Sequence, residues 1–209
     1  MGDQADWEHR YGGDRPMWSG NPNGTLVHEV ADLQPGRVLD VGAGEGGDAM
    51  WFAERGWQVT ATDISANALA RVTAEAGRRG LDVECRQLDG NALDAFAPGG
   101  YDLVSMQYGS IHRTPDQRAL ANLLAAVAPG GTLLVVGHDL TPLQQPVDVA
   151  TQTRMFDPGA YLGIDEIAAA LADSPEWKIE LHETRPRPAG ALSTHHVDDV
   201  VLRARRLPV

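Results

Sequence analysis

Short apolar runs alternate with amphipathic stretches over the middle of the chain, from about residue 37 to residue 138. Five of these runs have the length and apolar content of buried β-strands, at 37–41, 57–62, 82–88, 101–107 and 132–138. Helical segments fall between most of them, as in a chain of parallel βαβ units. We therefore predict an α/β fold with helices on both faces of a mostly parallel sheet.

Two of the predicted helices have recognisable boundaries. The first is expected to begin after Ser65, a suitable N-cap, and to end at Gly80, a suitable C-terminal glycine. The second is expected to open at Pro115, with a buried stripe that runs from Leu120 to Val127. Each places one apolar face toward the predicted sheet.

The pattern changes in the last third of the chain. The stretch 141–163 is irregular and contains three prolines, and a loop of that length is usually functional or mobile. A helix is expected to start at Ile164. Two further strands, at 177–183 and 196–205, would form an antiparallel pair, and the loop 185–190 between them could close over a substrate.

Composition indicates an ordinary globular protein. Hydrophobic residues make up 43% of the 209 residues, which is enough for the core of one domain. No apolar run approaches the ~18 residues of a membrane span, and the polar N-terminal segment has the features of neither a secretory signal nor a transit peptide. The single cysteine, Cys85, excludes an intrachain disulfide. We therefore expect a cytoplasmic protein.

The charge balance narrows the choice of partner. Seventeen Lys and Arg against 29 Asp and Glu give a formal net charge of −12. Nucleic acids and anionic membranes are bound through clustered Lys and Arg, so this balance argues against both. We expect a small-molecule partner, and a monomer or homodimer.

A glycine-rich turn follows the first predicted strand. Gly42, Gly44 and Gly47 match the G-x-G-x-x-G pattern, in which glycines let the backbone turn and approach a ligand. Asp63 lies 63 − 42 = 21 residues further on, at the end of the second strand, where an acid can accept both hydroxyls of a ribose. A nicotinamide cofactor and another adenosyl ligand fit this pattern equally well.

Acidic residues favour the second of these ligands. Asp40 stands two residues before Gly42, where a carboxylate would repel a pyrophosphate but would suit a ligand with an ammonium and a sulfonium group. The glycines also fit the alternative spacing Asp40-x-Gly42-x-Gly44-x-Gly46. Asp89 follows the third strand, where an acid can accept from an adenine amino group.

Taken in order, these motifs make the chain resemble the class I S-adenosylmethionine-dependent methyltransferases. The resemblance covers about residues 36–138 and includes Tyr101-Asp-Leu-Val104 and Pro129-Gly-Gly-Thr-Leu-Leu-Val135. It implies a Rossmann-like three-layer αβα sandwich, with a seven-stranded, mostly parallel sheet that has one antiparallel strand near the C-terminus. It also implies S-adenosyl-L-methionine as the cofactor.

The resemblance further implies which residues hold that cofactor. Asp40 and the glycine loop would hold the methionine part and Asp63 the ribose, while Asp89 and the residues after it would hold the adenine. Gln107, just past the fourth strand, would line the methyl-transfer site. The implied cofactor-binding residues are Tyr11, Trp18, Asp40, Gly42, Ala43, Gly44, Gly46, Asp63, Ile64, Asp89, Gly90, Asn91, Ala92 and Gln107.

Aromatic residues near the N-terminus suggest a finer resemblance. Trp7-Glu-His-Arg-Tyr11 and Trp18 are placed as in small methyltransferases that act on thiols, thiopurines, halides or tellurite and fold such residues over the cofactor. Packing on the sheet is the simpler alternative for these aromatics. Residues 1–209 would then form a single methyltransferase domain. Its parts would be an N-terminal helical cover (1–35, with helices at 3–11 and 23–31), a cofactor-binding half (36–140) and a substrate-side half (141–209).

Three side chains could take a proton from a methyl acceptor. His112, His138 and Tyr108 lie near the predicted ends of the fourth and fifth strands, so each is a candidate catalytic residue. The transfer would be an in-line displacement, for which the protein mainly supplies proximity and orientation. A thiol or chalcogenide acceptor would need little more than deprotonation and a dry pocket, whereas a hydroxyl or amine would need one of these bases.

No metal site is expected. The segment Met106-Gln-Tyr-Gly-Ser110 supplies none of the carboxylates that magnesium-dependent members of this class need. His195 and His196, close to Asp198, are more simply polar residues of the last strand. Two other functions stay open: a non-catalytic S-adenosylmethionine-binding protein and, against the repulsion expected from Asp40, an NAD(P)-dependent oxidoreductase.

Overall fold

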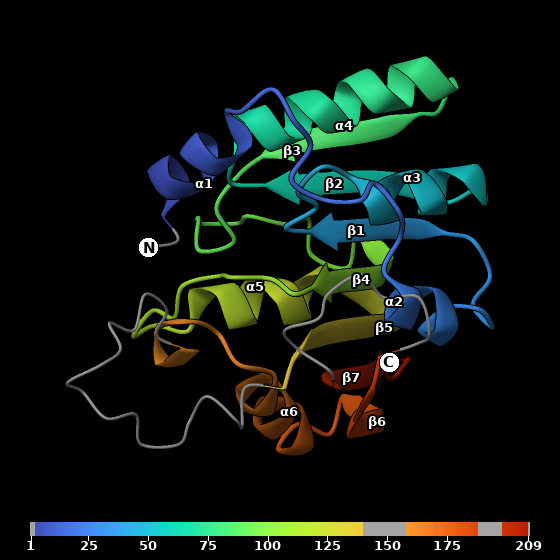
Figure 1. Cartoon of the computed structure of the whole chain (residues 1–209). Coiled ribbons are helices and arrows are strands. Elements are labelled where there is room, and N and C mark those ends of the chain that lie inside the picture. The colour runs from blue at the N-terminus through green and yellow to red at the C-terminus, as the bar shows by residue number, and fades with distance from the viewer. Residues whose placement is uncertain (1–2, 140–157, 188–197, 209) are drawn as a thin grey trace.

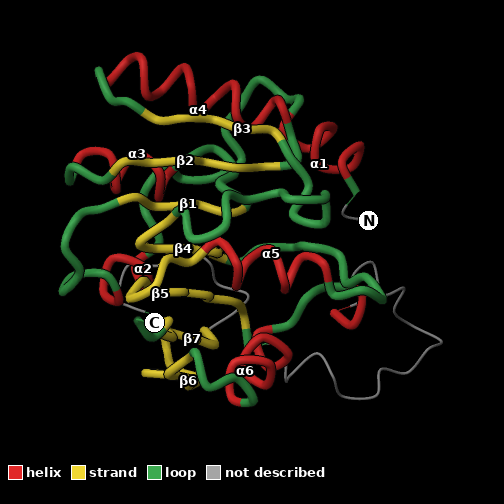
Figure 2. The backbone as a smooth tube through the Cα atoms, turned by 180° about the vertical axis from the view of Figure 1, so that it is seen from behind, coloured by secondary structure: helices red, strands yellow, loops and turns green. Residues whose placement is uncertain are grey.

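Seven strands form one mixed sheet in the order β3-β2-β1-β4-β5-β7-β6 (Figures 1 and 2). The structure is a computed structural model that describes residues 3–139, 158–187 and 198–208. The strands are β1 (Arg37–Val41), β2 (Gln58–Asp63), β3 (Val83–Gln87), β4 (Tyr101–Gln107), β5 (Val127–His138), β6 (Trp177–Pro186) and β7 (Asp198–Arg206). Only β7 runs antiparallel to its neighbours, β5 and β6, so the predicted fold class is confirmed.

Six α-helices flank the sheet within the described part of the chain. They are α1 (Gln4–Tyr11), α2 (Gly24–Glu29), α3 (Gly47–Glu54), α4 (Ala66–Arg79), α5 (Arg118–Ala126) and α6 (Ile164–Ala172), with a short 3₁₀ turn, η2, at Pro158–Ala160. The predicted N-terminal helices are therefore present as α1 and α2. None of these helices is long and apolar enough to cross a bilayer.

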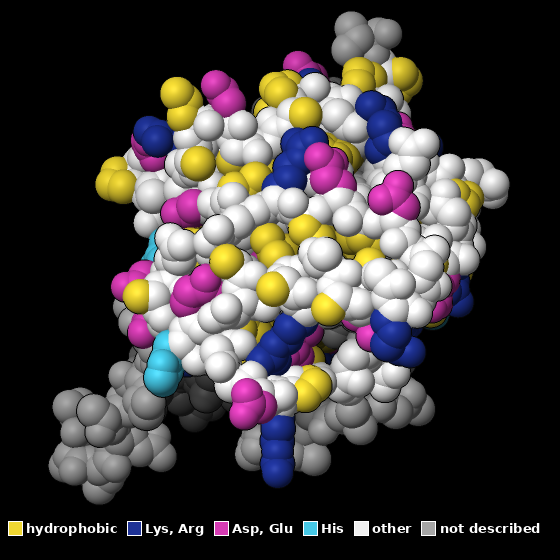
Figure 3. Space-filling model, turned by 90° about the horizontal axis from the view of Figure 1, so that it is seen from above, with side chains coloured by type: hydrophobic (Ala, Val, Ile, Leu, Met, Phe, Trp, Pro, Cys, Tyr) yellow, Lys and Arg dark blue, Asp and Glu magenta, His cyan; other side chains and the backbone are white. Residues whose placement is uncertain are grey.

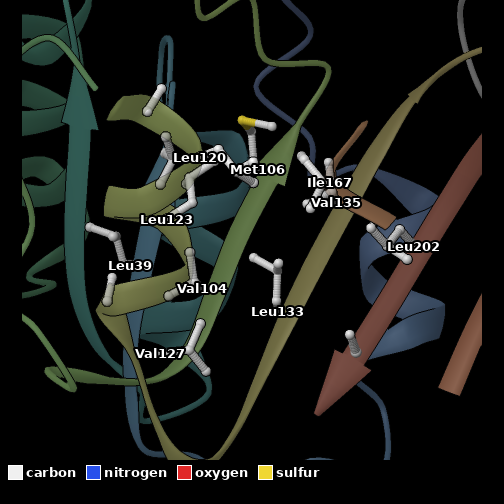
Figure 4. Close-up of a cluster of buried hydrophobic side chains, with 14 of the residues drawn as sticks. Leu39, Val104, Met106, Leu120, Leu123, Val127, Leu133, Val135, Ile167 and Leu202 are labelled. Carbon is white, nitrogen blue, oxygen red and sulfur yellow. The ribbon is translucent and has the colours of Figure 1, made fainter. Parts of the chain in front are cut away.

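The two faces of the sheet bury separate apolar cores. Alternate residues of the central strands point to opposite faces, so Leu133 and Val135 of β5 join one core while Leu134 and Val136 join the other. The first core is closed by α5 and α6, and Figure 4 shows its side chains between the strands and α5. The second core is closed by α2, α3 and α4. This layering leaves the strand ends as the place where a ligand can reach the backbone.

The boundaries predicted for α4 are confirmed. The Ser65 hydroxyl accepts a hydrogen bond from the backbone N–H of Ala68 at 3.2 Å, and Gly80 adopts a left-handed conformation with φ of +68°. Arg78 and Arg79 lie in the last turn, where cations stabilise the helix dipole. The start of α4 therefore fixes residues 64 and 65, which connect β2 to this helix at the predicted site.

Three predicted boundaries were wrong. The helix after Pro115 begins only at Arg118, because Gln117 adopts a left-handed conformation with φ of +50°. Val127 belongs to β5, where it pairs with Tyr101, and not to the helical stripe. The loop expected from residue 185 also begins later, since Arg185 and Pro186 still pair with β7.

Three predictions lie wholly or mainly outside the described residues. They concern the irregular stretch 141–163, of which 158–163 is described, the loop residues 188–190, and His195 with His196.

The strand order places the carboxyl ends of β1 and β4 side by side, at the point where the chain reverses its direction across the sheet. In such folds this reversal point is where ligands bind.

Candidate active site

A cavity of about 1400 Å³ lies at the carboxyl ends of the parallel strands. Figure 1 shows α1 at the same end of the sheet, where the arrowheads of β1 and β2 point. The glycine loop after β1, the ends of β2 and β4 and the N-terminal segment all contribute to its lining. The predicted residues that line it are Tyr11, Trp18, Asp40, Gly42, Ala43, Gly44, Gly46, Asp63, Ile64, Asp89, Gly90, Gln107, Tyr108, His112 and His138.

The glycine loop needs its glycines for two different reasons. Gly42, Gly44 and Gly46 have φ angles of +71°, +54° and +83°, a region that other residues rarely adopt. A Cβ atom on Gly46 would also lie 2.8 Å from a methyl group of Val72 on α4. The loop is thereby held close to α4, and its backbone lines the cavity directly in front of α3.

Asp63 connects the end of β2 to this loop. Its Oδ2 accepts a hydrogen bond from the backbone N–H of Gly44 at 2.9 Å, and its Oδ1 accepts one from Ser65 at 2.9 Å. Burial raises the pKa of the Asp63 carboxyl, although hydrogen bonds from Ser65 and Gly44 act in the opposite direction. The carboxylate is therefore fixed in orientation at the edge of the cavity, where ribose hydroxyls are expected.

Asp40 and Gln107 place unpaired acceptors beside the cavity. Asp40 is 2% exposed, and its Oδ2 has no hydrogen-bond partner among the described residues. Burial, together with the charges of Asp48 and Asp63, raises the pKa of Asp40 well above its ordinary value. The Oε1 of Gln107 likewise lacks a described partner, while its Nε2 donates to Ser105. Buried acceptors of this kind require donors, which a cationic ligand can supply.

The N-terminal cover carries Tyr11 and Trp18 to the glycine loop. The indole Nε1 of Trp18 donates to the hydroxyl of Tyr11 at 3.0 Å, and a Cβ atom on Gly44 would lie 2.9 Å from that hydroxyl. Burial raises the pKa of Tyr11 to about 12. Both aromatics therefore stand against the loop at the cavity, while Trp18 keeps 56% of its surface exposed.

Polar side chains that were not predicted fasten this cover. The carboxylate of Glu8 on α1 accepts hydrogen bonds from the Ser65 hydroxyl and from the backbone N–H groups of Ala66 and Asn67, so it caps α4. These hydrogen bonds, chiefly that of Ser65, lower the pKa of Glu8. Further contacts come from Glu45, inside the glycine motif. No short-range pattern indicates such contacts, because the partners are separated by up to 59 residues.

A second group of polar residues closes the opposite side of the cavity. Asp199 of β7 is fully buried and accepts hydrogen bonds from Tyr108, Thr25 and Arg187, each at 2.8 Å. Tyr108 stacks on His138, with ring centroids 4.5 Å apart, and the Arg187 guanidinium lies over the Tyr108 ring. Burial and the Asp199 carboxylate raise the pKa of Tyr108. We name these five residues the Asp199 cluster; the sequence analysis did not predict Thr25, Arg187 or Asp199 as site residues.

His112 lies apart from this cluster. Its ring stacks on Tyr161, with centroids 4.7 Å apart, and its backbone forms an isolated bridge to the same residue. The His112 carbonyl accepts a hydrogen bond from the Nδ2 of Asn91 at 3.0 Å. The structure thus brings His138 and Tyr108 into contact with each other and places His112 on a separate part of the lining.

The segment after β3 is placed only partly as predicted. Asp89 and Gly90 line the cavity, and the Asp89 carboxylate accepts from the backbone N–H of Asn91 at 2.8 Å. Asn91 and Ala92 are not among the described residues that line it. The carbonyl of Ala92 accepts from Asn122 of α5 instead, which stabilises the turn behind Asp89. Within residues 3–139, 158–187 and 198–208, no group of three His, Cys, Asp or Glu side chains is arranged to hold a metal ion.

Comparison with known proteins agrees with this geometry. The family described as "Methyltransferase domain" matches residues 38–131, from β1 into β5. A solved structure of an S-adenosylmethionine-dependent methyltransferase from Methanosarcina mazei superimposes with a TM-score of 0.65 at 20% identity, over 88% of this chain and 98% of that one. Residues 38–131 thus match a methyltransferase domain, and the chain as a whole has the fold of that solved methyltransferase. The resemblance to methyltransferases, and with it the cofactor that the motifs implied, is confirmed over the matched domain.

Two curated relatives extend the comparison. The chain is 34% identical to demethylmenaquinone methyltransferase of Thermobifida fusca over 152 residues, which are 70% of this chain and 60% of that protein. It is also 34% identical to ribosomal RNA small subunit methyltransferase C of Alcanivorax borkumensis over 137 residues, 59% of this chain and 41% of that protein. The chain therefore spans less than two thirds of the length of either relative.

The residues present fit S-adenosylmethionine. The unpaired oxygens of Asp40 and Gln107 need donors, and the ammonium group of the methionine part has only donors. Asp63 offers a rigidly held acceptor at the end of β2, and Trp18 with Tyr11 lies against the glycine loop. The same buried acidic surroundings oppose a pyrophosphate, which disfavours a nicotinamide dinucleotide.

Proposed function

We propose that this protein transfers a methyl group from S-adenosylmethionine to a small-molecule acceptor. The observation that carries the proposal is the pair of buried, unpaired acceptors, Asp40 Oδ2 and Gln107 Oε1, beside the glycine loop. When bound, S-adenosylmethionine supplies an electrophilic methyl group on a sulfonium sulfur. The two acceptors would orient the cationic methionine part, and Asp63 would fix the ribose.

The residues of the chain would contribute mainly orientation and exclusion of water. Holding two reactants in line can account for ~7–11 kcal/mol of a barrier in the best intramolecular cases. The N-terminal cover supports this role, since Tyr11 and Trp18 shield the glycine loop. On the opposite side, Tyr161 and Leu162 add apolar surface to the same cavity.

The three candidate bases differ in their surroundings. The Tyr108 hydroxyl donates a hydrogen bond to the buried Asp199 carboxylate, and its raised pKa opposes its use as a base. The ring of His138 is held between Tyr108 and Arg187. We therefore assign proton removal, for an acceptor that needs it, to His112, whose ring lines the cavity against Tyr161.

A small metabolite is the acceptor that the surface and the cavity favour. Figure 3 shows basic and acidic side chains interspersed on the face seen from above, without the clustered Lys and Arg that nucleic acids require. The relative from Thermobifida fusca is named for a small acceptor, demethylmenaquinone. We extend the proposal to a thiol, chalcogenide, hydroxyl or amine of a metabolite, and to a cytoplasmic monomer or homodimer consisting of one domain.

The test is cofactor binding followed by turnover. Calorimetric titration with S-adenosylmethionine, with NADH as comparator, should show binding of the first alone. Formation of S-adenosylhomocysteine should then be followed by mass spectrometry in an acceptor screen that begins with thiols. Binding without any methylated product, over a broad screen, would favour a non-catalytic binding protein, and binding of NADH alone would contradict the proposal.

A further inference from the structure

Both carboxylate oxygens of Asp199 accept hydrogen bonds from other residues of the Asp199 cluster. Asp199 has 0% of its surface exposed and receives three hydrogen bonds, two from hydroxyl groups and one from the Nε of Arg187. A buried carboxylate is costly unless it is paired and hydrogen-bonded. Arg187, whose side chain is 10% exposed, supplies the only described positive charge that touches it. The guanidinium is therefore anchored by one edge.

Another nitrogen of the same guanidinium meets His138. The NH2 group of Arg187 makes a hydrogen bond with the Nδ1 of His138. A guanidinium has five N–H donors and no acceptor, so the proton in this contact belongs to Arg187 and Nδ1 must accept it. A neutral imidazole has one N–H and one acceptor nitrogen. The ring hydrogen of His138 is therefore on Nε2.

Stacking keeps the ring in the plane that this contact needs. The rings of His138 and Tyr108 are 4.5 Å apart and inclined by 28°. Tyr108 is itself tied to Asp199 through its hydroxyl, and the Arg187 guanidinium carbon lies 4.9 Å from the Tyr108 ring centroid. Asp199 thus orients both residues that hold the His138 ring. Tyr108 stacks on the face of that ring, and Arg187 contacts its Nδ1.

We propose that Arg187, anchored by Asp199, is a positioning residue that fixes His138 in the Nε2–H tautomer, so that His138 serves as a hydrogen-bond donor in the cavity and not as a base. The role of His138 as a donor rests on the proposed function, whereas its tautomer follows from its contacts alone. A donor at this place suits an acceptor molecule with a lone pair to offer, such as a carbonyl, a carboxylate or a thiolate.

The opposite tautomer would require a rearrangement. To bear a hydrogen on Nδ1, His138 would have to lose its contact with Arg187, because two donors cannot share one hydrogen bond. Arg187 could move away only by leaving Asp199 buried with two hydroxyl partners and no counter-charge. Removing one partner of a buried ion pair is strongly destabilising, so the observed arrangement should persist in solution.

The direct test is the tautomer of His138 in the whole protein. Uniformly ¹⁵N-labelled histidine should be introduced, the signals of His138 assigned by their loss in His138→Gln, and long-range ¹H–¹⁵N correlations recorded at neutral pH. The expected result is an unprotonated Nδ1 and a protonated Nε2. A protonated Nδ1, or a doubly protonated ring, would overturn the proposal, and this reading depends on neither a variant of Arg187 nor turnover.

A variant of Arg187 separates positioning from simple folding. In Arg187→Met the tautomeric preference of His138 should be lost, giving averaged signals for both nitrogens. Arg86→Met is the matched control, since Arg86 on β3 is exposed and pairs only with Glu84 among the described residues. An unchanged His138 spectrum in folded Arg187→Met would refute the positioning role. Should that variant fail to fold, the wild-type spectrum still decides.

Kinetics then connect the tautomer to the acceptor. Once an acceptor is known, His138→Gln should raise its KM about tenfold, which corresponds to roughly 1.4 kcal/mol, and should change kcat little. A large fall in kcat with a change in its pH profile would instead identify His138 as a base and refute the proposal. Binding of S-adenosylmethionine, measured separately, tells whether the proposed function itself has failed.

Discussion

Glu45 of the glycine loop forms an ion pair with Arg71 of α4, and the two side chains together hold the N-terminal cover. The Glu45 carboxylate also accepts hydrogen bonds from the backbone N–H groups of Met17 and Trp18, at 3.0 and 2.8 Å. Arg71 donates to the carbonyl of Tyr11 at 2.8 Å. The loop that lines the cavity is therefore physically coupled to the segment that covers it.

Loss of this ion pair should weaken cofactor binding. Arg71→Met removes the donor to the Tyr11 carbonyl and leaves Glu45 without its cation. The N-terminal cover should therefore be held less firmly against the glycine loop. We expect the Kd for S-adenosylmethionine to rise about tenfold, roughly 1.4 kcal/mol, in calorimetric titration. Arg79→Met, on the same helix, is the control because Arg79 pairs with Glu54 and Glu75, none of which lines the cavity. Equal affinities in the two variants would show that the cover plays no part.

Asp63 should be necessary for the cofactor site. In Asp63→Ala both hydrogen bonds that fix Gly44 and Ser65 are lost, together with the acceptor that we propose for the ribose. We expect the Kd for S-adenosylmethionine to rise at least about tenfold, because hydrogen bonds to charged groups contribute ~1.5–3 kcal/mol. Asp82→Ala, an exposed acid before β3, supplies the control. An unchanged Kd for S-adenosylmethionine in Asp63→Ala would show that Asp63 does not contribute to the cofactor site.

The sequence was informative where structure depends on near neighbours. The caps of α4 at Ser65 and Gly80 were predicted because capping involves residues within one turn. The glycine loop and Asp63 were predicted because they belong to one βαβ unit of about 30 residues, a unit whose packing constrains its sequence. The same locality misled at Val127, which continues a helical stripe but pairs with Tyr101 in the sheet.

The sequence was uninformative where the site depends on distant residues. Thr25 and Asp199 are 174 positions apart, and Arg187 and His138 are 49 apart. No periodicity links such pairs, because their contact is a product of the strand order and of the packing of α2. His138 could therefore be predicted to lie near the cavity, while the arginine that contacts its Nδ1 could not.

Removal of the buried charge at Asp40 should stabilise the ligand-free protein. The folded-state pKa of Asp40 is raised above its unfolded value, so its contribution to stability is fully present below the unfolded pKa and is lost as the pH rises through the folded one. Asp40→Asn abolishes that loss. We expect a higher melting temperature than wild type at pH 8 and a smaller difference at pH 5, with cofactor binding weakened at both.

The measurement is thermal unfolding across this pH range, with and without S-adenosylmethionine. Asp82→Asn, which changes an exposed acid, should melt like the wild type throughout. A lower melting temperature for ligand-free Asp40→Asn at pH 8 would mean that the Asp40 carboxylate is stabilised in the folded protein, contrary to the burial and the neighbouring acids described above.

Two glycine-to-alanine substitutions should change stability in opposite directions. Gly46→Ala places a Cβ atom 2.8 Å from Val72 at a φ of +83°, and such strain costs ~1–3 kcal/mol. Gly77→Ala lies inside α4 with no atom within 4 Å of the added Cβ, so it should stabilise the protein by ~0.5–1 kcal/mol. Urea unfolding of both variants measures the difference. If Gly46→Ala were as stable as Gly77→Ala, the glycine loop would not need its close approach to α4.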